Sequence, residues 1–283
     1  MGSLLTFGLI ALLAVRWRIF LKKQHLNLPL ATLVPLTWSG QFFNSILPGS
    51  TGGDLIKILQ LCRFYPDRKA EGAVTVVMDR FTALIALVAL AGCALLIQPI
   101  SLADVLGNGS FQLPWWLLFA LACITTVACA VVITFCRKPV WQSRFTRLLA
   151  VVKASLRPSP SLAAALFLSF VIHCISFAIA YCFAQSLHLT VTVTKIFMFM
   201  PVLVFLVMMP VTVNGHGLRE VLLIFYFNKL GIAAPAALGS GVKEAAVALS
   251  ALIVMNDLLW SLPGGLWYLL LFKNTEKLRE SIA

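Results

Sequence analysis

The residues of this sequence best suited to chemistry are charged side chains inside or beside apolar segments. Acids and bases stand next to each other or within one helical turn, as in Asp79-Arg80 and Arg219-Glu220. An ionised group at the centre of a membrane helix costs about 2.5–3.5 kcal/mol on insertion scales, so it must be paired, hydrated or functional. The charges outside evident loops are Asp54, Lys57, Asp79, Arg80, Arg219, Glu220, Lys243, Glu244 and Asp257.

Two of these charge groups follow a proline and a glycine-rich break. Segment 43–53 passes through a proline and GSTGG before Asp54, and segment 205–217 passes through a proline and NGHG before Arg219. A helix that begins after such a break offers backbone N–H groups and the positive end of its dipole to an anion. A structural alternative stays open, in which Asp54 caps its own helix and Arg219 pairs with Glu220. The candidate anion ligands at the breaks are Gly52, Gly53, Lys57, Asn214 and Arg219.

The composition places these residues in a membrane protein. Of 283 residues, 60% are hydrophobic and 11% are charged, whereas about a quarter of the residues of a soluble protein are charged. The net charge is +12, from 22 bases and 10 acids. Most of the bases stand beside apolar runs, where they orient membrane helices, so a nucleic-acid partner is not expected.

Six apolar segments are long enough to form membrane helices, which need about 20 residues each. Because the last segment is long enough to be broken or doubled, the sequence predicts an all-α polytopic protein with about six to eight transmembrane helices. The segments are 3–21, 71–97, 113–136, 160–187, 191–213 and 232–272.

The distribution of bases predicts the topology. Loop 137–157 has six bases and no acid, which makes it cytoplasmic. Counting helices back from it puts 54–71 inside, yet the basic stretch 16–25 is also predicted to be inside. The intervening segment 26–53 must therefore enter and leave on one side, or lie in the interface, and its prolines Pro29, Pro35 and Pro48 are expected to break a continuous helix.

A re-entrant hairpin is the simplest structure for this segment, because irregular backbone at that depth needs protein or a watery cavity around it. Segment 191–230 has a similar pattern and would re-enter from outside. The sequence thus predicts a single membrane domain, 1–283, with two broken or re-entrant elements. The halves 1–136 and 160–283, joined by the loop 137–157, are hypothesised to form an inverted repeat, which places a substrate site near the bilayer midplane.

Several catalytic and metal-binding patterns are missing from the sequence. Its seven cysteines include no CxxC pair and are interpreted as packing residues. There is no P-loop, HExxH or GxSxG motif and no stretch long enough for a soluble transferase domain. We therefore expect no metal, no cofactor, no catalytic residue and no enzymatic activity.

The charged motifs together resemble those of the lysylphosphatidylglycerol synthase transmembrane region, a flippase-like domain. The resemblance rests on NSILPGSTGGD at 44–54 with Lys57, VMDR at 77–80, NGHGLRE at 214–220 after Pro210, and LPGGL at 262–266. The family usually has Arg in place of Lys57, and Lys loses the bidentate geometry with phosphate. It also usually begins with one more helix.

The resemblance implies a function in lipid transport. In two-domain relatives a cytoplasmic domain attaches lysine to phosphatidylglycerol and the membrane region moves the product across the bilayer; the sequence has no such catalytic domain. We therefore expect a lipid translocase of the bacterial inner membrane, which moves an anionic lipid through a laterally open polar groove. The expected lipid-binding residues are Gly52, Gly53, Asp54, Lys57, Asp79, Arg80, Asn214, Arg219 and Glu220.

The sequence is also compatible with two other functions. The first is a membrane-embedded transferase that acts on a lipid-linked substrate, with Asp54 or Asp79 as the acid or base. The second is a non-transporting membrane subunit that supports a lipid- or glycan-synthesis enzyme, which would then be a partner besides membrane lipids. Altered lipid products would favour the first function, and co-purification with a synthase would favour the second.

Overall fold

The computed structural model describes residues 2–47, 52–97, 153, 157–208, 215–232 and 241–280. The chain divides into two compact units, Met1–Gln98 with Pro158–Ala283 and Pro99–Arg157. The fold described below is that of the first unit. The predicted helix 113–136 and nearly all of loop 137–157 lie outside the described residues.

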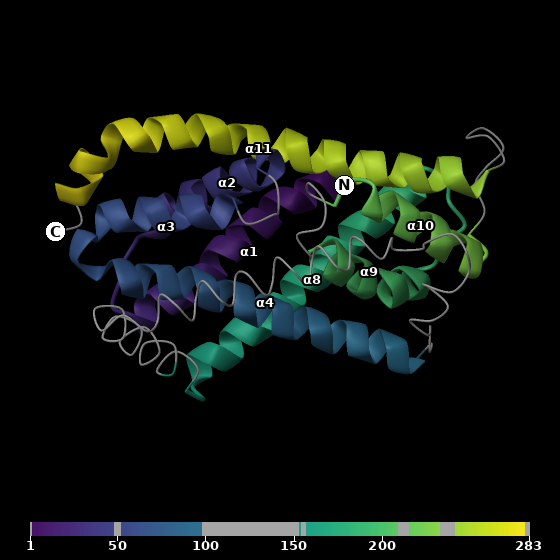
Figure 1. The fold of residues 1–283 in the computed structure, drawn as a ribbon, viewed down its shortest axis with the longest axis horizontal. Helices are drawn as coiled ribbons and strands as arrows, with labels where there is room; N and C mark the ends of the chain where they lie inside the picture. Colours follow the sequence, from purple (N-terminus) through teal and green to yellow (C-terminus); the bar gives the residue numbers. More distant parts are fainter. Residues whose placement is uncertain are drawn as a thin grey trace, which may run out of the picture. The chain divides into compact units, whose positions relative to one another are not determined.

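All regular secondary structure in the described part of the chain is helical. Four stretches are long and apolar enough to cross a membrane: Gly2–Lys23, Pro66–Ala94, Pro160–Ser186 and Val242–Leu270. They confirm the predicted all-α, multi-pass architecture. The elements are α1 (Gly2–Lys23), α2 (Leu30–Ile46), α3 (Gly52–Phe64), the 3₁₀ turn η1 (Pro66–Arg68), α4 (Lys69–Ile97), α8 (Pro160–Ser186), α9 (Val193–Val207), α10 (Leu218–Lys229) and α11 (Val242–Glu280) (Figure 1).

Helices α2 and α3 form an antiparallel hairpin around the first glycine-rich break. The Gly53 N–H donates to Asn44 Oδ1 at 2.8 Å, and a Cβ on Gly53 would collide with the carbonyl oxygen of Gly40. Farther from the break, Leu36 of α2 and Leu61 of α3 belong to one buried apolar cluster. The helices therefore run back along each other from the break.

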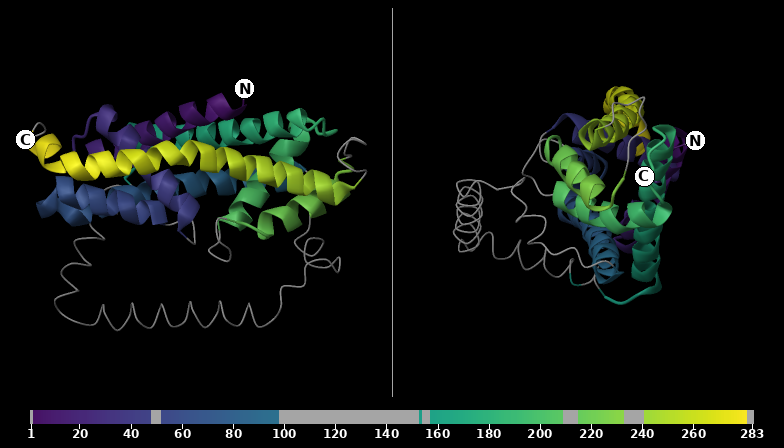
Figure 2. Two further views of the ribbon diagram at one scale, coloured as in Figure 1. Left: turned by 90° about the horizontal axis from the view of Figure 1, so that it is seen from above. Right: turned by 90° about the vertical axis from the view of Figure 1, so that its right-hand side faces the viewer.

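Helices α9 and α10 form a second antiparallel hairpin around the second break. The rings of Phe199 and Tyr226 stack with centroids 5.4 Å apart, and Lys195 Nζ donates to the Leu230 carbonyl oxygen at 2.7 Å. The two hairpins lie toward opposite ends of the long helix α11 within this unit (Figures 1 and 2).

Each hairpin follows one long helix and precedes another, so the order long helix, hairpin, long helix occurs twice. Helix α11 packs against α2, α4 packs against α9, and α1 packs against α8. The turns that end α1 and α8 are also alike, because His25 and His188 both have a left-handed φ, 55° and 54°. In each turn the next residue, Leu26 or Leu189, donates its N–H five residues back, as in a Schellman motif.

Prolines lie in the interior of three of the described helices, and the prediction that Pro35 breaks the helix is wrong. Pro35 is inside α2, Pro201 inside α9 and Pro263 inside α11. A proline inside a helix costs about 3 kcal/mol, but α2 is held by α3 on one side and α11 on another, and this packing maintains the helix. From Val242 onward α11 is one continuous helix rather than a broken or doubled one.

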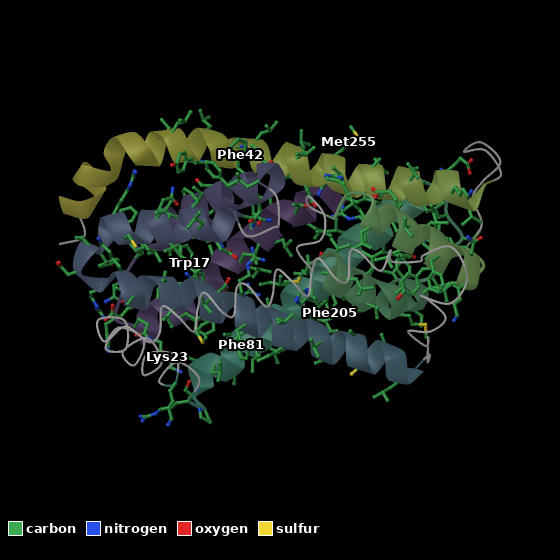
Figure 3. The ribbon with its side chains drawn as sticks, viewed as in Figure 1. Trp17, Lys23, Phe42, Phe81, Phe205 and Met255 are labelled. Carbon is green, nitrogen blue, oxygen red and sulfur yellow. The ribbon has the colours of Figure 1, made fainter. Side chains whose placement is uncertain are left out.

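The core where α1, α2, α3 and α4 meet centres on Trp17. This side chain is fully buried and donates from Nε1 to Thr75 Oγ1 at 3.2 Å (Figure 3). Large apolar side chains also point outward, such as Met255 on α11, which is 65% exposed (Figure 3). An apolar outer surface around an interior that includes buried polar side chains suits helices surrounded by hydrocarbon.

Candidate functional site

The centre of the candidate site is a buried ion pair between α1 and α4. Arg16 donates from Nε to Asp79 Oδ1 at 2.7 Å and from Nη2 to Asp79 Oδ2 at 3.0 Å. Its Nη1 donates to Ser169 Oγ of α8 at 3.1 Å. The two charged residues are 3% and 5% exposed. This bidentate arrangement neutralises both charges and connects three long helices.

Lys57 of α3 is buried beside this pair. Its Nζ lies 5.1 Å from the centre of the Trp17 ring, within the range of a cation–π contact. A Cβ on Gly40 would lie 2.8 Å from Lys57 Cε, so the glycine makes room for the lysine stem. Lys57 also interacts electrostatically with both Asp79 and Asp54. The break therefore delivers a buried cation to the centre of the charged group.

Arg80 and Asp54 form a second ion pair, between α4 and α3. Arg80 Nε lies 2.5 Å from Asp54 Oδ2, and the two side chains are 38% and 16% exposed. Adjacent residues on a helix point about 100° apart, so Asp79 and Arg80 cannot share one partner. Asp79 pairs with Arg16 of α1, and Arg80 pairs with Asp54 of α3. The structural alternative had Asp54 capping its own helix, whereas Asp54 pairs with Arg80 across the two helices.

Gly52 and Gly53 have a packing role that the anion-site prediction did not include. Both residues are buried, and the Gly53 N–H already donates to Asn44 Oδ1. A Cβ on Gly52 would lie against the Leu47 side chain. The prediction that Gly53 offers a free N–H to an anion is therefore wrong, because the side chain of Asn44 occupies that donor.

Glu220 and Arg219 lie at the start of α10, at the second break. Glu220 accepts the Gly217 N–H at 2.6 Å through Oε2 and the Ser250 hydroxyl of α11 at 2.5 Å through Oε1. Arg219 is 8% exposed and interacts electrostatically with Glu220 and with Asp257 of α11. Asn214 lies outside the described residues.

The predicted site residues thus fall into two groups. The first group combines Asp54, Lys57, Asp79 and Arg80 with Arg16, and the second contains Arg219 and Glu220. The hydrogen bonds and ion pairs above connect residues within each group and not between them. The first group has three cations and two carboxylates, and its excess positive charge suits it to an anion.

Sequence reasoning did not assign Arg16, Asn44 or Ser169 to the site, although Asn44 begins the motif at 44–54. Arg16 was attributed to the basic stretch 16–25, although it stands seven residues before the end of α1 at Lys23. That depth, almost two turns inside an apolar helix, was the available signal. In the described part of the chain no cluster of three His, Cys, Asp or Glu residues could hold a metal ion.

Comparison with known proteins identifies a family for this chain. The family described as "Lysylphosphatidylglycerol synthase TM region" matches residues 1–254 of the chain. No curated protein and no solved structure matches it. The matched residues include both glycine-rich breaks and both charged groups, and they confirm the resemblance found from the motifs. The chain therefore belongs to the lysylphosphatidylglycerol synthase transmembrane region family.

Proposed function

We propose that this multi-pass membrane protein is a lipid translocase of the bacterial inner membrane, which moves an anionic phospholipid between leaflets. Family membership indicates a membrane protein of lipid metabolism or transport. The proposal goes further and assigns transport without enzymatic chemistry.

The observation that supports it best is the first group, Arg16, Asp54, Lys57, Asp79 and Arg80. Arg16, Lys57 and Asp79 are buried. Charges inside apolar helices are expensive and typically mark the path of a polar substrate or ion. Three cations against two carboxylates leave one positive charge, which the phosphate of a lipid headgroup would neutralise. The acyl chains would remain in the bilayer, so only the headgroup needs a polar path.

The two hairpins supply the second line of support. Each has an antiparallel pair of short helices around a glycine-rich break, and they lie toward opposite ends of α11 (Figure 1). In transporters built from inverted repeats, broken helices from the two faces meet at a site near the midplane. We propose that the α2/α3 hairpin enters from the cytoplasmic face and the α9/α10 hairpin from the outer face.

Within this path we assign the phosphate contact to Lys57 and Arg80 in the first group and to Arg219 in the second. Asp54, Asp79 and Glu220 hold these bases in place and lower the free energy of burying them when no lipid is bound. Gly52 and Gly53 contribute by letting α3 approach α2, which positions Lys57. Transport would be downhill or driven by the membrane potential or protons.

Reconstitution tests this function directly. Purified protein in liposomes with fluorescently labelled phosphatidylglycerol should make the inner-leaflet label accessible to an impermeant quencher faster than empty liposomes do. Lys57→Gln and Arg219→Ala should each slow this exchange about tenfold or more, because a hydrogen bond between charged groups contributes about 1.5–3 kcal/mol. Lys57→Arg, which keeps the charge, should retain most of the rate.

The matched control is Lys22→Gln, which removes one positive charge from an exposed position at the end of α1. It should exchange lipid at the unsubstituted rate. Exchange no faster than in empty liposomes, or an unchanged rate in both Lys57→Gln and Arg219→Ala, would contradict the proposal.

A further inference from the structure

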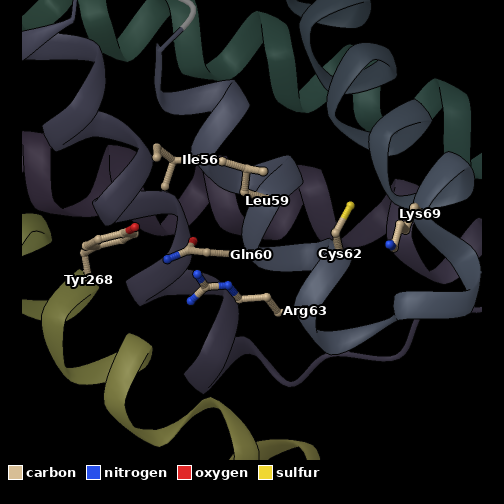
Figure 4. A pocket seen from close by; sticks show the side chains of 7 residues that line it. All are labelled: Ile56, Leu59, Gln60, Cys62, Arg63, Lys69 and Tyr268. Carbon is tan, nitrogen blue, oxygen red and sulfur yellow. The ribbon is translucent and has the colours of Figure 1, made fainter.

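A pocket lies at the end of α3 remote from the glycine break, outside the charged groups described above. It has a volume of about 290 Å³ and is partly open. Its polar lining consists of Gln60, Arg63, Lys69 and Tyr268. Figure 4 shows the polar ends of Tyr268, Gln60 and Arg63 pointing toward one another, from α11 on one side and α3 on the other.

One atom of this lining is buried and lacks a hydrogen bond. Gln60 is 8% exposed, and among the described residues its Oε1 has no hydrogen-bond partner. A buried acceptor without a donor costs about 1–3 kcal/mol. A ligand that brings an O–H or N–H group to this position would remove that penalty, so the pocket favours a headgroup that includes a hydrogen-bond donor.

The charged and apolar side chains of the pocket indicate which other chemical groups the ligand should have. Arg63 and Lys69 are both exposed cations at the pocket; the Arg63 guanidinium lies on the side of Gln60 and Tyr268, and Lys69 lies on the far side beyond Cys62 (Figure 4). A guanidinium beside a hydrogen-bonding side chain suits a phosphate. Leu59, which is 51% exposed, and Ile56 form an apolar side of the same pocket. Phosphate, a hydroxyl donor and an apolar part together describe an anionic phospholipid.

We propose that this pocket binds the phosphodiester headgroup of an anionic lipid, with Arg63 on the phosphate, Gln60 accepting a headgroup hydroxyl, and Lys69 adding positive charge from the far side of the pocket. The pocket is near the turn where Arg68 donates to the Gln24 carbonyl oxygen, beside the basic end of α1. By charge distribution that end is cytoplasmic. The ligand is therefore a lipid of the cytoplasmic leaflet, bound outside the buried group of Lys57.

Cys62 provides a direct measure of occupancy, because it lines the pocket and is a free thiol. The purified full chain in detergent would be treated with a maleimide, and the rate of labelling at Cys62 followed by peptide mass spectrometry. Dioctanoyl phosphatidylglycerol should slow the labelling of Cys62 several-fold. Cys174 of α8, a free thiol of similar exposure, should be labelled at an unchanged rate.

A comparison of three probes distinguishes an anionic phospholipid from other phosphate compounds as the ligand of the pocket. Dioctanoyl phosphatidylcholine has the same tails but no headgroup hydroxyl, and sn-glycerol 3-phosphate has the phosphate and hydroxyls without tails. Both should protect Cys62 much less than dioctanoyl phosphatidylglycerol. Equal protection by phosphatidylcholine would overturn the headgroup assignment, and equal protection by glycerol 3-phosphate would overturn the lipid assignment.

Substitutions test the named contacts. Arg63→Gln should raise the half-protecting lipid concentration about tenfold, as expected for the loss of a charge-assisted hydrogen bond, and Lys69→Gln should raise it less. Gln60→Leu should raise it about threefold, because a neutral hydrogen bond contributes less. Lys22→Gln is the charge-matched control and should leave protection unchanged.

An unchanged half-protecting concentration in Arg63→Gln would overturn the proposal. The assay uses detergent, where no lipid crosses a bilayer, so its result is independent of the translocation proposal. Normal lipid exchange without protection of Cys62 would show that the pocket proposal is wrong. Protection of Cys62 without lipid exchange would show that the translocation proposal is wrong.

Discussion

At the scale of single residues, the Arg16–Asp79 pair should contribute strongly to stability. Breaking a buried ion pair by removing one partner typically costs 3–5 kcal/mol, because the other charge remains buried without compensation. Asp79→Asn leaves Arg16 in that position, and we expect unfolding in detergent to become easier by about 3–5 kcal/mol. The midpoint of thermal unfolding, followed by circular dichroism, measures the change.

Asp54→Asn is the matched comparison, since it removes the same kind of charge from a more exposed pair. Solvent screening limits that loss to about 1 kcal/mol or less. A double substitution, Arg16→Met with Asp79→Leu, should recover much of the stability, because apolar residues of similar volume often replace a buried pair without loss. If Asp79→Asn were no less stable than Asp54→Asn, the pair would not have the importance assigned to it.

The residue scale also shows what sequence reasoning could and could not find. It identified Asp54, Lys57, Asp79 and Arg80, because charges in apolar segments are rare. It did not identify their partners, since Asp79 could pair with the adjacent Arg80 or with any base that the fold brings close. Only the packing of α1 against α4 selects Arg16, and that contact spans 63 positions of the chain.

At the scale of elements, the close approach of α2 and α3 depends on Gly53. A Cβ there would collide with the backbone carbonyl of Gly40, which cannot move aside as a flexible side chain could. We expect Gly53→Ala to destabilise the protein by about 1–3 kcal/mol, as overpacking does, and to displace Lys57. Thermal unfolding and the lipid-exchange assay together measure both effects.

Gly92→Ala in α4 is the control, because a Cβ at Gly92 meets nothing within 4 Å. An alanine in a helix is more favourable than glycine by about 0.5–1 kcal/mol, so this variant should be as stable as the unsubstituted chain or more so. Equal stability of the two alanine variants would show that α2 and α3 do not need the glycine contact.

The sequence located the two breaks around which α2/α3 and α9/α10 turn back, but it did not reveal the internal geometry of these turns. The basic stretches before and after 26–53 are both predicted to be cytoplasmic, so the segment between them was expected to return to the side from which it entered. The glycines located the break. The prolines were misleading, because a helix held by neighbours on two sides tolerates Pro35. The donor at Gly53 was also misjudged, since a side chain nine residues earlier, Asn44, accepts its hydrogen bond.

At the scale of the whole described unit, similar features of α1 and α8 recur at a constant interval along the chain. His188 follows His25 by 163 positions, and Ser169 follows Thr6 by the same interval. Ser169 accepts from Arg16, and Thr6 accepts from Asn256 of α11 at 3.0 Å. Thr6 of α1 and Ser169 of α8 thus each accept a hydrogen bond from a side chain of another long helix.

An inverted repeat requires equivalent turns to lie on opposite sides of the membrane, which can be tested at Asn27 and Thr190. Both residues are exposed, they follow α1 and α8, and they are 163 positions apart. In a background with the seven native cysteines replaced by serine, Thr190→Cys should react with an impermeant maleimide in intact spheroplasts. Asn27→Cys should react only after the membrane is permeabilised, because its turn adjoins the basic end of α1. Labelling of both positions from the same side would exclude opposite orientations, and the two hairpins would then enter the membrane from one face.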